Sequence, residues 1–179
     1  MSIVFVTGNK YKYQEVQSVL KNYDIIIENI DLPEIQGTDD EIIKHKMEYA
    51  KIFVKGKFMV EDSSLEYDAL NGMPGVYVKW FLNSIGNNGL VKLLDGYENK
   101  SANAICNIGY YDGKDNYIFR GIAKGRIVPS NGTSLFGWDN IFMPDGFDKT
   151  YGQMDRELKN SISHRRVALD KLNNHLSNN

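Results

Sequence analysis

The sequence has a single cysteine, Cys106, among its 179 residues. One thiol excludes an internal disulfide and a cysteine-based metal cluster, and such sparse use of cysteine is typical of a reducing compartment. We expect Cys106 to be a buried structural thiol. Long hydrophobic runs are also missing: none approaches the roughly 18 residues of a membrane-spanning helix, and no basic segment of a secretory signal opens the chain. These absences predict a cytoplasmic protein without a membrane partner.

An excess of charge of one sign is missing as well. The chain has 21 Lys and Arg against 23 Asp and Glu, a formal net charge of −2. Domains that bind nucleic acid through their overall field are usually strongly basic, so no nucleic-acid partner is expected, and a polyanionic ligand must be bound by local clusters. The sequence has no internal repeat and no linker. At roughly 100 to 200 residues per domain, it predicts a single domain over residues 1–179.

Strand and helix patterns alternate along the first third of the chain. Residues 3–6 form a short β-branched and aromatic run that ends at a turn over residues 7–9, after which apolar residues recur at helical spacing. Residues 25–27 indicate a second strand, and Asp39 or Asp40 is expected to cap the helix that follows. This alternation favours an α/β fold.

The remainder of the chain adds antiparallel and helical signals. An aromatic segment over residues 77–85 is a helix candidate. Residues 102–110 alternate between apolar and polar, and a turn separates them from a second extended segment over residues 117–128, which predicts a β-hairpin that extends the sheet. Ser161 or Ser163 is expected to cap a final amphipathic helix.

The turn over residues 7–12 is the first candidate for binding chemistry. It reads Thr-Gly-Asn-Lys-Tyr-Lys and opens a predicted helix. A helix N-terminus offers unpaired N–H donors and the positive end of the dipole, and a lysine in the first turn adds charge, which together suit a phosphate. An ordinary strand-to-helix turn with solvated lysines explains the pattern equally well, because it is neither a P-loop nor a GxGxxG fingerprint.

Acidic residues form a second candidate site. A third buried strand is predicted over residues 58–60 and would carry Asp62 at its carboxyl end, where ligands of α/β sheets usually bind. Glu34, Glu41 and Glu61 are the other acids, and Mg²⁺ prefers carboxylate, water and phosphate oxygens. Successive strand residues point to opposite faces, so Glu61 and Asp62 are not expected to enter one site together. Taken singly, each acid is more often a solvated surface residue.

Aromatic and basic residues near the end of the chain form a third group. Residues 136–139 read Phe-Gly-Trp-Asp, and aromatic faces of this kind stack on bases, while a carboxylate accepts from a ring N–H. A plain core segment would explain the two rings equally well. Residues 163–166, preceded by Lys159, read Ser-His-Arg-Arg and could bind a carbonyl or phosphate oxygen, although a solvated basic face is the simpler account.

Taken together and in this order, these segments resemble the inosine triphosphate pyrophosphatase family, the Ham1-like nucleotide hydrolases. The resemblance covers nearly the whole chain and is specific because the motifs occur jointly. They are Phe5-Val6-Thr7-Gly8-Asn9 with Lys12, Asp31-Leu32-Pro33-Glu34 with Gln36-Gly37, Val60-Glu61-Asp62-Ser63, Gly72-Met73-Pro74-Gly75 with Tyr77 and Lys79-Trp80-Phe81, Phe136-Gly137-Trp138-Asp139, and Ser163-His164-Arg165.

The resemblance implies hydrolysis of ITP, dITP and XTP to the monophosphate and pyrophosphate, with Mg²⁺ required and Mn²⁺ as a substitute. It implies a long, twisted mixed β-sheet with flanking helices, two lobes around a central cleft, and a homodimer. Glu34 and Asp62 would hold the metal. The groups at or near the triphosphate would be Thr7, Gly8, Asn9, Lys10, Tyr11, Lys12, Lys46 and Lys159. The base site would contain Phe136, Gly137, Trp138, Asp139, His164 and Arg165.

Two positions depart from the family pattern. Val76 stands where proline is usual, and Ser63 stands where many members have threonine. Neither change removes a charged group. Proline fixes φ and valine does not, so the loop before Lys79 is expected to be less rigid. Lys79 matches a functional lysine of the family pattern, and the sequence assigns it no role.

The mechanism that follows is direct attack of water on the α-phosphorus. Asp62 would orient or deprotonate the water, and lysines, Lys12 among them, would neutralise the charge that builds on the departing pyrophosphate. Arg165 is predicted to donate to the 6-oxo group of the purine, which adenine lacks; how guanine is rejected stays open. Two other functions remain possible at this point, a pyrophosphatase for modified pyrimidine nucleotides and a nucleotide-sensing module without turnover.

Overall fold

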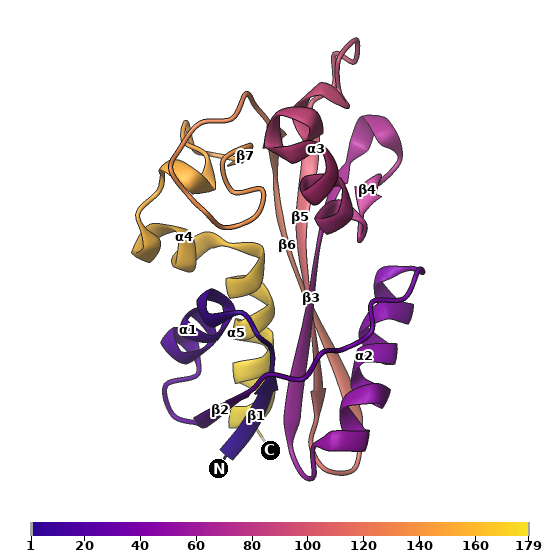
Figure 1. Cartoon of the computed structure of the whole chain (residues 1–179). Helices are drawn as coiled ribbons and strands as arrows, with labels where there is room; N and C mark the ends of the chain where they lie inside the picture. The colour runs from indigo at the N-terminus through magenta and orange to yellow at the C-terminus, as the bar shows by residue number, and fades with distance from the viewer. Residues whose placement is uncertain (1, 179) are drawn as a thin grey trace. The chain divides into compact units, whose positions relative to one another are not determined.

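The computed structural model describes residues 2–178 and has a mixed α/β fold, which confirms the predicted class (Figure 1). Within this range no helix combines the length and apolar character needed to cross a membrane. The strands are β1 (Ser2–Val6), β2 (Asp24–Glu28), β3 (Phe58–Tyr67), β4 (Pro74–Gly75), β5 (Ser101–Tyr111), β6 (Asn116–Ile127) and β7 (Phe142–Pro144). The helices are α1 (Lys10–Val19), α2 (Asp39–Phe53), α3 (Val78–Lys92), α4 (Arg156–Ile162) and α5 (His164–Ser177), with short 3₁₀ turns η1 (Asp68–Leu70) and η2 (Tyr151–Gln153).

The strands form one seven-stranded mixed sheet in the order β2-β1-β3-β5-β6-β7, with β4 paired to β3. β1 is parallel to both β2 and β3, whereas β4 pairs with β3 and β7 with β6 in antiparallel sense. β5 and β6 are the arms of the predicted hairpin, which the structure confirms.

The chain divides into two compact units. Within the described range, unit 1 contains residues 2–62, 106–121 and 165–178, and unit 2 contains residues 63–105 and 122–164. The unit boundary therefore falls inside β3, directly after Asp62, and again between His164 and Arg165. This division separates the candidate site residues into two sets, which are described separately below.

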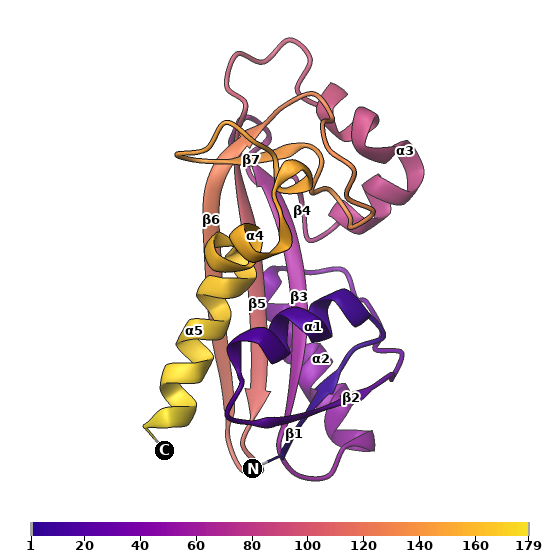
Figure 2. The ribbon, with the colours of Figure 1, turned by 90° about the vertical axis from the view of Figure 1, so that its left-hand side faces the viewer.

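Unit 1 has helices on both faces of its part of the sheet (Figures 1 and 2). α1 and α5 pack on one face through Val16 and Leu169, against β-strand residues that include Met59. α2 packs on the other face through Met47, against residues that include Val60. Because the side chains of a strand alternate between the faces, β3 directs Met59 and Glu61 toward α1 and α5, and Val60 and Asp62 toward α2.

Unit 2 has its own core of aromatic and aliphatic side chains. Its fully buried members include Tyr67 of β3, Leu90 of α3, and Phe142 of β7, and Trp138 packs against them. α3 is not continuous: Gly86 has φ of 66° and ψ of −177°, which interrupts the helix and starts a second helical segment.

Two local predictions were wrong in informative ways. α2 is capped by Thr38 rather than by Asp39 or Asp40, because a capping box forms between Thr38 and Glu41. β3 does not end at residue 60 but runs on to Tyr67, so Asp62 lies inside the strand and not at its end. The final helix, α5, is preceded by the short helix α4, and Ser163 lies between them in extended conformation, directly before α5 as its predicted cap would. The prediction that Cys106 is a buried free thiol is confirmed.

Candidate active site

The turn before α1 is held by its own side chains. Asn9 caps the helix, since its Oδ1 accepts from the backbone N–H groups of Tyr11 and Lys12 at 3.0 and 3.2 Å. The backbone N–H of Asn9 donates to Thr7 Oγ1 at 3.1 Å. A Cβ at Gly8 would lie 2.6 Å from Asn29 Oδ1, so any larger residue would displace the Asn29 side chain. The turn is thus a fixed strand-to-helix connection that presents the positive end of α1.

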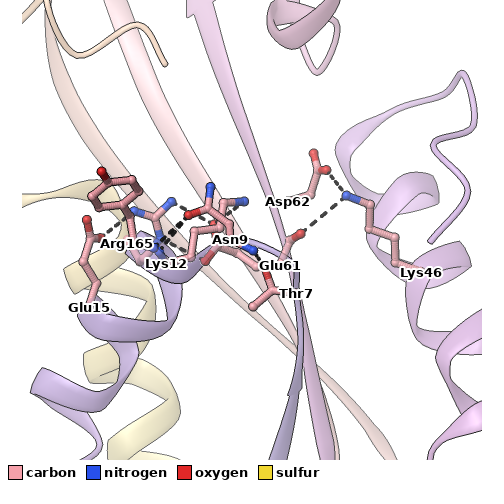
Figure 3. Close-up of polar contacts among 9 residues, drawn as sticks. Thr7, Asn9, Lys12, Glu15, Lys46, Glu61, Asp62 and Arg165 are labelled. Atoms are coloured by element: carbon pink, nitrogen blue, oxygen red, sulfur yellow. Dashed lines mark hydrogen bonds and ion pairs between the residues drawn. The ribbon is translucent and has the colours of Figure 1, made fainter. Parts of the chain in front are cut away.

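A buried ionic network stands beside this turn, on the α1 and α5 face of β3 (Figure 3). Arg165 donates through Nε and Nη2 to the two carboxylate oxygens of Glu61, both at 2.9 Å, and through Nη1 to Glu15 Oε2 at 2.5 Å. Lys12 Nζ lies 3.0 Å from Glu61 Oε1. The side chains of Arg165 and Glu61 are each 1% exposed. This bidentate geometry fixes the orientation of both partners.

The network determines the charge of Glu61. Burial opposes ionisation, but the Arg165 guanidinium and the Lys12 ammonium outweigh it and hold the pKa of the Glu61 carboxyl far below its ordinary value. The neighbouring Cys106 thiol has the opposite response, since burial raises its pKa well above the ordinary value. Glu61 is therefore a constant negative charge, and Cys106 is an inert thiol.

Asp62 lies on the opposite face of β3, toward α2. Lys46 Nζ is 2.5 Å from Asp62 Oδ1 and 3.4 Å from the backbone carbonyl of Glu61 (Figure 3). Burial raises the pKa of the Asp62 carboxyl despite the pairing with Lys46 and the influence of Lys12, and the charge of Glu34 raises it further. Asp62 is thus a carboxyl whose ionisation is opposed by its surroundings, a property common among groups that accept protons in catalysis.

Glu34 and Asp62 are the two residues predicted to hold a metal ion. The two carboxylates lie close enough for one to affect the pKa of the other, and Glu34 is exposed in the loop before α2. Among residues 2–178, no cluster of three or more His, Cys, Asp or Glu side chains is arranged to hold an ion. Carboxylates are the donor type that Mg²⁺ takes, one or two at a time, with water and phosphate oxygens completing its shell.

Unit 2 brings the aromatic and basic candidates together. Lys159 Nζ lies 2.5 Å from Asp139 Oδ2 and 4.8 Å from the centre of the Phe136 ring. Trp138 and His164 pack with ring centres 5.3 Å apart. Phe136 is half-buried, Gly137 is exposed, and the other four side chains are buried. The group therefore has one partly exposed ring, Phe136, beside a buried ion pair and two buried rings.

The remaining predicted site residues are either exposed or bound to other side chains. Lys10 and Tyr11 are exposed in the first turn of α1, and Lys79 is exposed at the start of α3. Arg165 differs most from expectation, because its Nε, Nη1 and Nη2 all donate to the carboxylates of Glu61 and Glu15 and its side chain is 1% exposed. Glu15 was missed by sequence analysis. Its only signal is the three-residue spacing from Lys12, which places both on one face of a helix.

A mixed α/β sheet that presents a buried carboxyl, lysines and a helix N-terminus in one unit defines a protein suited to a phosphate-bearing ligand. Comparison with known proteins identifies the family within this class. The model of the Ham1 family matches residues 3–175, and the chain belongs to this family.

Its relatives and structural neighbours agree with this assignment. The chain is 47% identical to an inosine triphosphate pyrophosphatase of Scheffersomyces stipitis, over 98% of this chain and 97% of that protein. It is 46% identical to the inosine triphosphate pyrophosphatase of Schizosaccharomyces pombe, over 98% and 95%. The solved structure of the Staphylococcus aureus Ham1 protein is similar, with a TM-score of 0.86 at 29% identity over 99% of each chain.

Proposed function

We propose that the protein hydrolyses ITP, dITP and XTP to the monophosphate and pyrophosphate, and thereby removes deaminated purines from nucleotide pools. The observation that carries the proposal is the environment of Asp62, a partly buried carboxyl paired with Lys46 and close to Glu34 and Lys12. The names of the relatives, which match over nearly the whole chain, support the same substrate class.

In this proposal unit 1 acts on the triphosphate. Asp62 orients or deprotonates the attacking water, because its raised pKa makes it a better proton acceptor than an ordinary aspartate. Lys46 and Lys12 neutralise the charge on the departing pyrophosphate. The N-terminus of α1, with Thr7, Gly8 and Asn9, supplies backbone donors to phosphate oxygens.

Glu34 and Asp62 are the residues that would hold Mg²⁺, or Mn²⁺ in its place. When bound, the ion would polarise phosphate oxygens and offset their charge. Until it binds, Lys46 is the partner that balances Asp62. Lys46 is therefore expected to keep Asp62 in place in the free enzyme.

Unit 2 would bind the purine. Phe136 is half-buried and would offer an aromatic face, whereas Trp138 is buried in the core of unit 2 and would support the site by packing. Asp139, held by Lys159, would offer a carboxylate that can accept from a ring N–H of the base. His164 packs on Trp138 and supports that ring. The predicted contact of Arg165 with the 6-oxo group stays a prediction, and its work in the free protein is to hold Glu61 and Glu15.

We also propose a homodimer, a cytoplasmic location and one domain over residues 1–179, as the family resemblance implies. The oligomer is tested by light scattering of the purified protein at several concentrations, where a mass of twice 20.4 kDa is expected.

The experiment that tests the activity is a panel of triphosphates with and without Mg²⁺. The highest kcat/KM is expected for ITP, dITP and XTP, with release of pyrophosphate and no turnover after chelation. ATP cleaved as efficiently as ITP would contradict the proposal. Preference for a modified pyrimidine triphosphate would identify the related pyrophosphatase, and tight binding of ITP without product would identify a sensing module.

A further inference from the structure

The loop that precedes Phe136 is held at Ser134 by the side chain of Asn140. Its Oδ1 accepts from the backbone N–H of Ser134 at 3.1 Å, and its Nδ2 donates to the backbone carbonyl of Ser134 at 2.9 Å. The carboxamide thus pairs with a single residue in the manner of a neighbouring strand. The backbone carbonyl of Asn140 also accepts from the N–H of Asn131 at 2.8 Å, so both ends of the loop return to this residue.

Two glycines make room for this arrangement. A Cβ on Gly152 would lie 2.0 Å from Asn140 Oδ1, and a Cβ on Gly132 would lie 2.9 Å from the same atom. No real Cβ approaches an atom so closely, and Gly132 also has φ of +123°, which favours glycine. A larger residue at Gly152 would therefore displace the Asn140 carboxamide, and one at Gly132 would first meet the backbone of Gly152 at 2.5 Å.

The hydroxyl of Ser134 extends the arrangement to the candidate base site. Ser134 Oγ accepts from the backbone N–H of Phe136 at 3.0 Å and donates to Asp139 Oδ2 at 3.1 Å. The same Asp139 oxygen pairs with Lys159, whose ammonium lies over the Phe136 ring. Ser134, Phe136, Lys159 and Asp139 therefore form a closed ring of contacts within unit 2.

We propose that Ser134 and Asn140 are positioning residues for the purine. Asn140 fixes the backbone of Ser134, and the Ser134 hydroxyl fixes both the backbone of Phe136 and the carboxylate of Asp139. The position of the Phe136 ring, on which a base would stack, and that of the Asp139 carboxylate are therefore both fixed before a nucleotide binds. The inference rests on the proposed function and adds two residues to it.

Preorganisation of this kind has a specific consequence for binding. A ligand that uses the base site gains affinity because the loop is already ordered, whereas a ligand without a base gains nothing from it. Loss of the Ser134 hydroxyl is therefore expected to weaken ITP binding roughly tenfold, about the effect of one lost hydrogen bond. Binding of inorganic tripolyphosphate, which has no base, is expected to stay unchanged.

The test compares Ser134→Ala with Ser130→Ala, a matched control because Ser130 is exposed in the same loop. For each protein, Kd is measured for ITP and for tripolyphosphate in Ca²⁺ in place of Mg²⁺, together with kcat/KM for ITP and the Tm. Ser134→Thr keeps the hydroxyl and is expected to restore ITP affinity. Asn140→Asp keeps the acceptor for the Ser134 N–H but loses the donor to its carbonyl, and is expected to weaken ITP binding alone.

The outcomes separate this inference from the proposed function. Weaker ITP binding with unchanged tripolyphosphate binding supports the positioning role. Equal Kd values for Ser134→Ala and Ser130→Ala, or a parallel loss of both ligands, overturn it while the proposed function stands. A wild-type protein that neither binds nor cleaves ITP overturns both. Should Ser134→Ala fail to fold, Asn140→Asp and Ser134→Thr decide the question by the same comparison.

Discussion

Glu61 and Asp62 are neighbours in β3 with opposite surroundings. Glu61 receives Arg165 and Lys12 on one face and stays charged, whereas Asp62 receives Lys46 on the other face and resists ionisation. Strand alternation alone produces this division. Glu61 is therefore expected to contribute to stability and Asp62 to catalysis, although the two residues are adjacent in the sequence.

Asp62→Asn is expected to lower kcat for ITP by roughly 10² to 10⁴, the usual contribution of a group that accepts a proton. The amide is nearly isosteric, so binding of the nucleotide should be largely kept. Steady-state kinetics and equilibrium binding give the two quantities. Asp148→Asn is the control, because Asp148 is exposed in a loop of unit 2. Near wild-type turnover of the Asp62 variant would exclude it as the catalytic group.

Glu61→Gln is expected to act on stability. It removes one partner of a buried ion pair, which costs about 3 kcal/mol, the low end of the usual range because Arg165 keeps Glu15. Urea unfolding of the variant gives the difference in free energy of unfolding. Glu28→Gln, at the exposed end of β2, should change it little. Equal midpoints for the Glu61 variant and the wild type would show that the network does not stabilise unit 1.

The stability difference between the wild type and Glu61→Gln is expected to depend on pH. The pKa of Glu61 in the folded state lies below its ordinary value of 4.5, so the unfolded chain takes up a proton first as the pH falls. The stability contributed by Glu61 is therefore complete above the ordinary value and is lost on acidification below it. The difference in unfolding free energy between wild type and Glu61→Gln should shrink between about pH 5.5 and about pH 3. A difference that does not change with pH would contradict this assignment.

Among the helices, α2 is the best anchored at its start. Thr38 and Glu41 form the capping box, and Asp39 Oδ1 accepts from the fully buried Asn107 of β5 at 2.8 Å. Arg120 of β6 then donates to Asn107 at 2.8 Å and to Asp40 at 2.7 Å. These contacts fix the helix that carries Lys46 against the hairpin, and so maintain the position of the lysine relative to Asp62.

α3 depends on one glycine. Gly86 has φ of 66° and ψ of −177°, a region that is essentially restricted to glycine. Gly86→Ala meets no side chain, since nothing lies within 4 Å of the added Cβ, so its cost comes from the backbone alone, about 1 to 3 kcal/mol. Thermal unfolding should show a lower Tm for this variant than for Asn88→Ala, an exposed position in the same helix. An unchanged Tm would mean that the break in α3 is not required.

Much of this arrangement could be predicted from local sequence. The first strand and helix, the hairpin and the buried Cys106 follow from patterns within a few residues. β3 was predicted too short because Glu61 and Asp62 interrupt its apolar run, and the partners that compensate them are distant: Arg165 is 104 residues from Glu61 and 150 from Glu15. Glu15 was missed for the same reason, since its partner Arg165 comes close only by folding. The contacts of Ser134 with Asn140 and Asp139 span only six and five residues, but they form in a loop, which has no periodic pattern.

For the chain as a whole, the account predicts stabilisation by a base-free anion. Tripolyphosphate with Mg²⁺ at about 100 times its Kd should raise the free energy of unfolding by about 2.7 kcal/mol. For a protein of this size that is a rise in Tm of roughly 5 to 10 °C. Scanning fluorimetry measures it, and removal of Mg²⁺ by chelation should reverse most of the gain. A Tm that does not respond to the anion would contradict the assignment of the unit 1 residues to the triphosphate.

The central claim is that these residues direct water to the α-phosphorus of a deaminated purine triphosphate. Hydrolysis of ITP in water labelled with heavy oxygen, followed by mass spectrometry of both products, tests it most directly. The account predicts the label in the nucleoside monophosphate and unlabelled pyrophosphate. Label in the pyrophosphate, or release of orthophosphate with the nucleoside diphosphate, would contradict it.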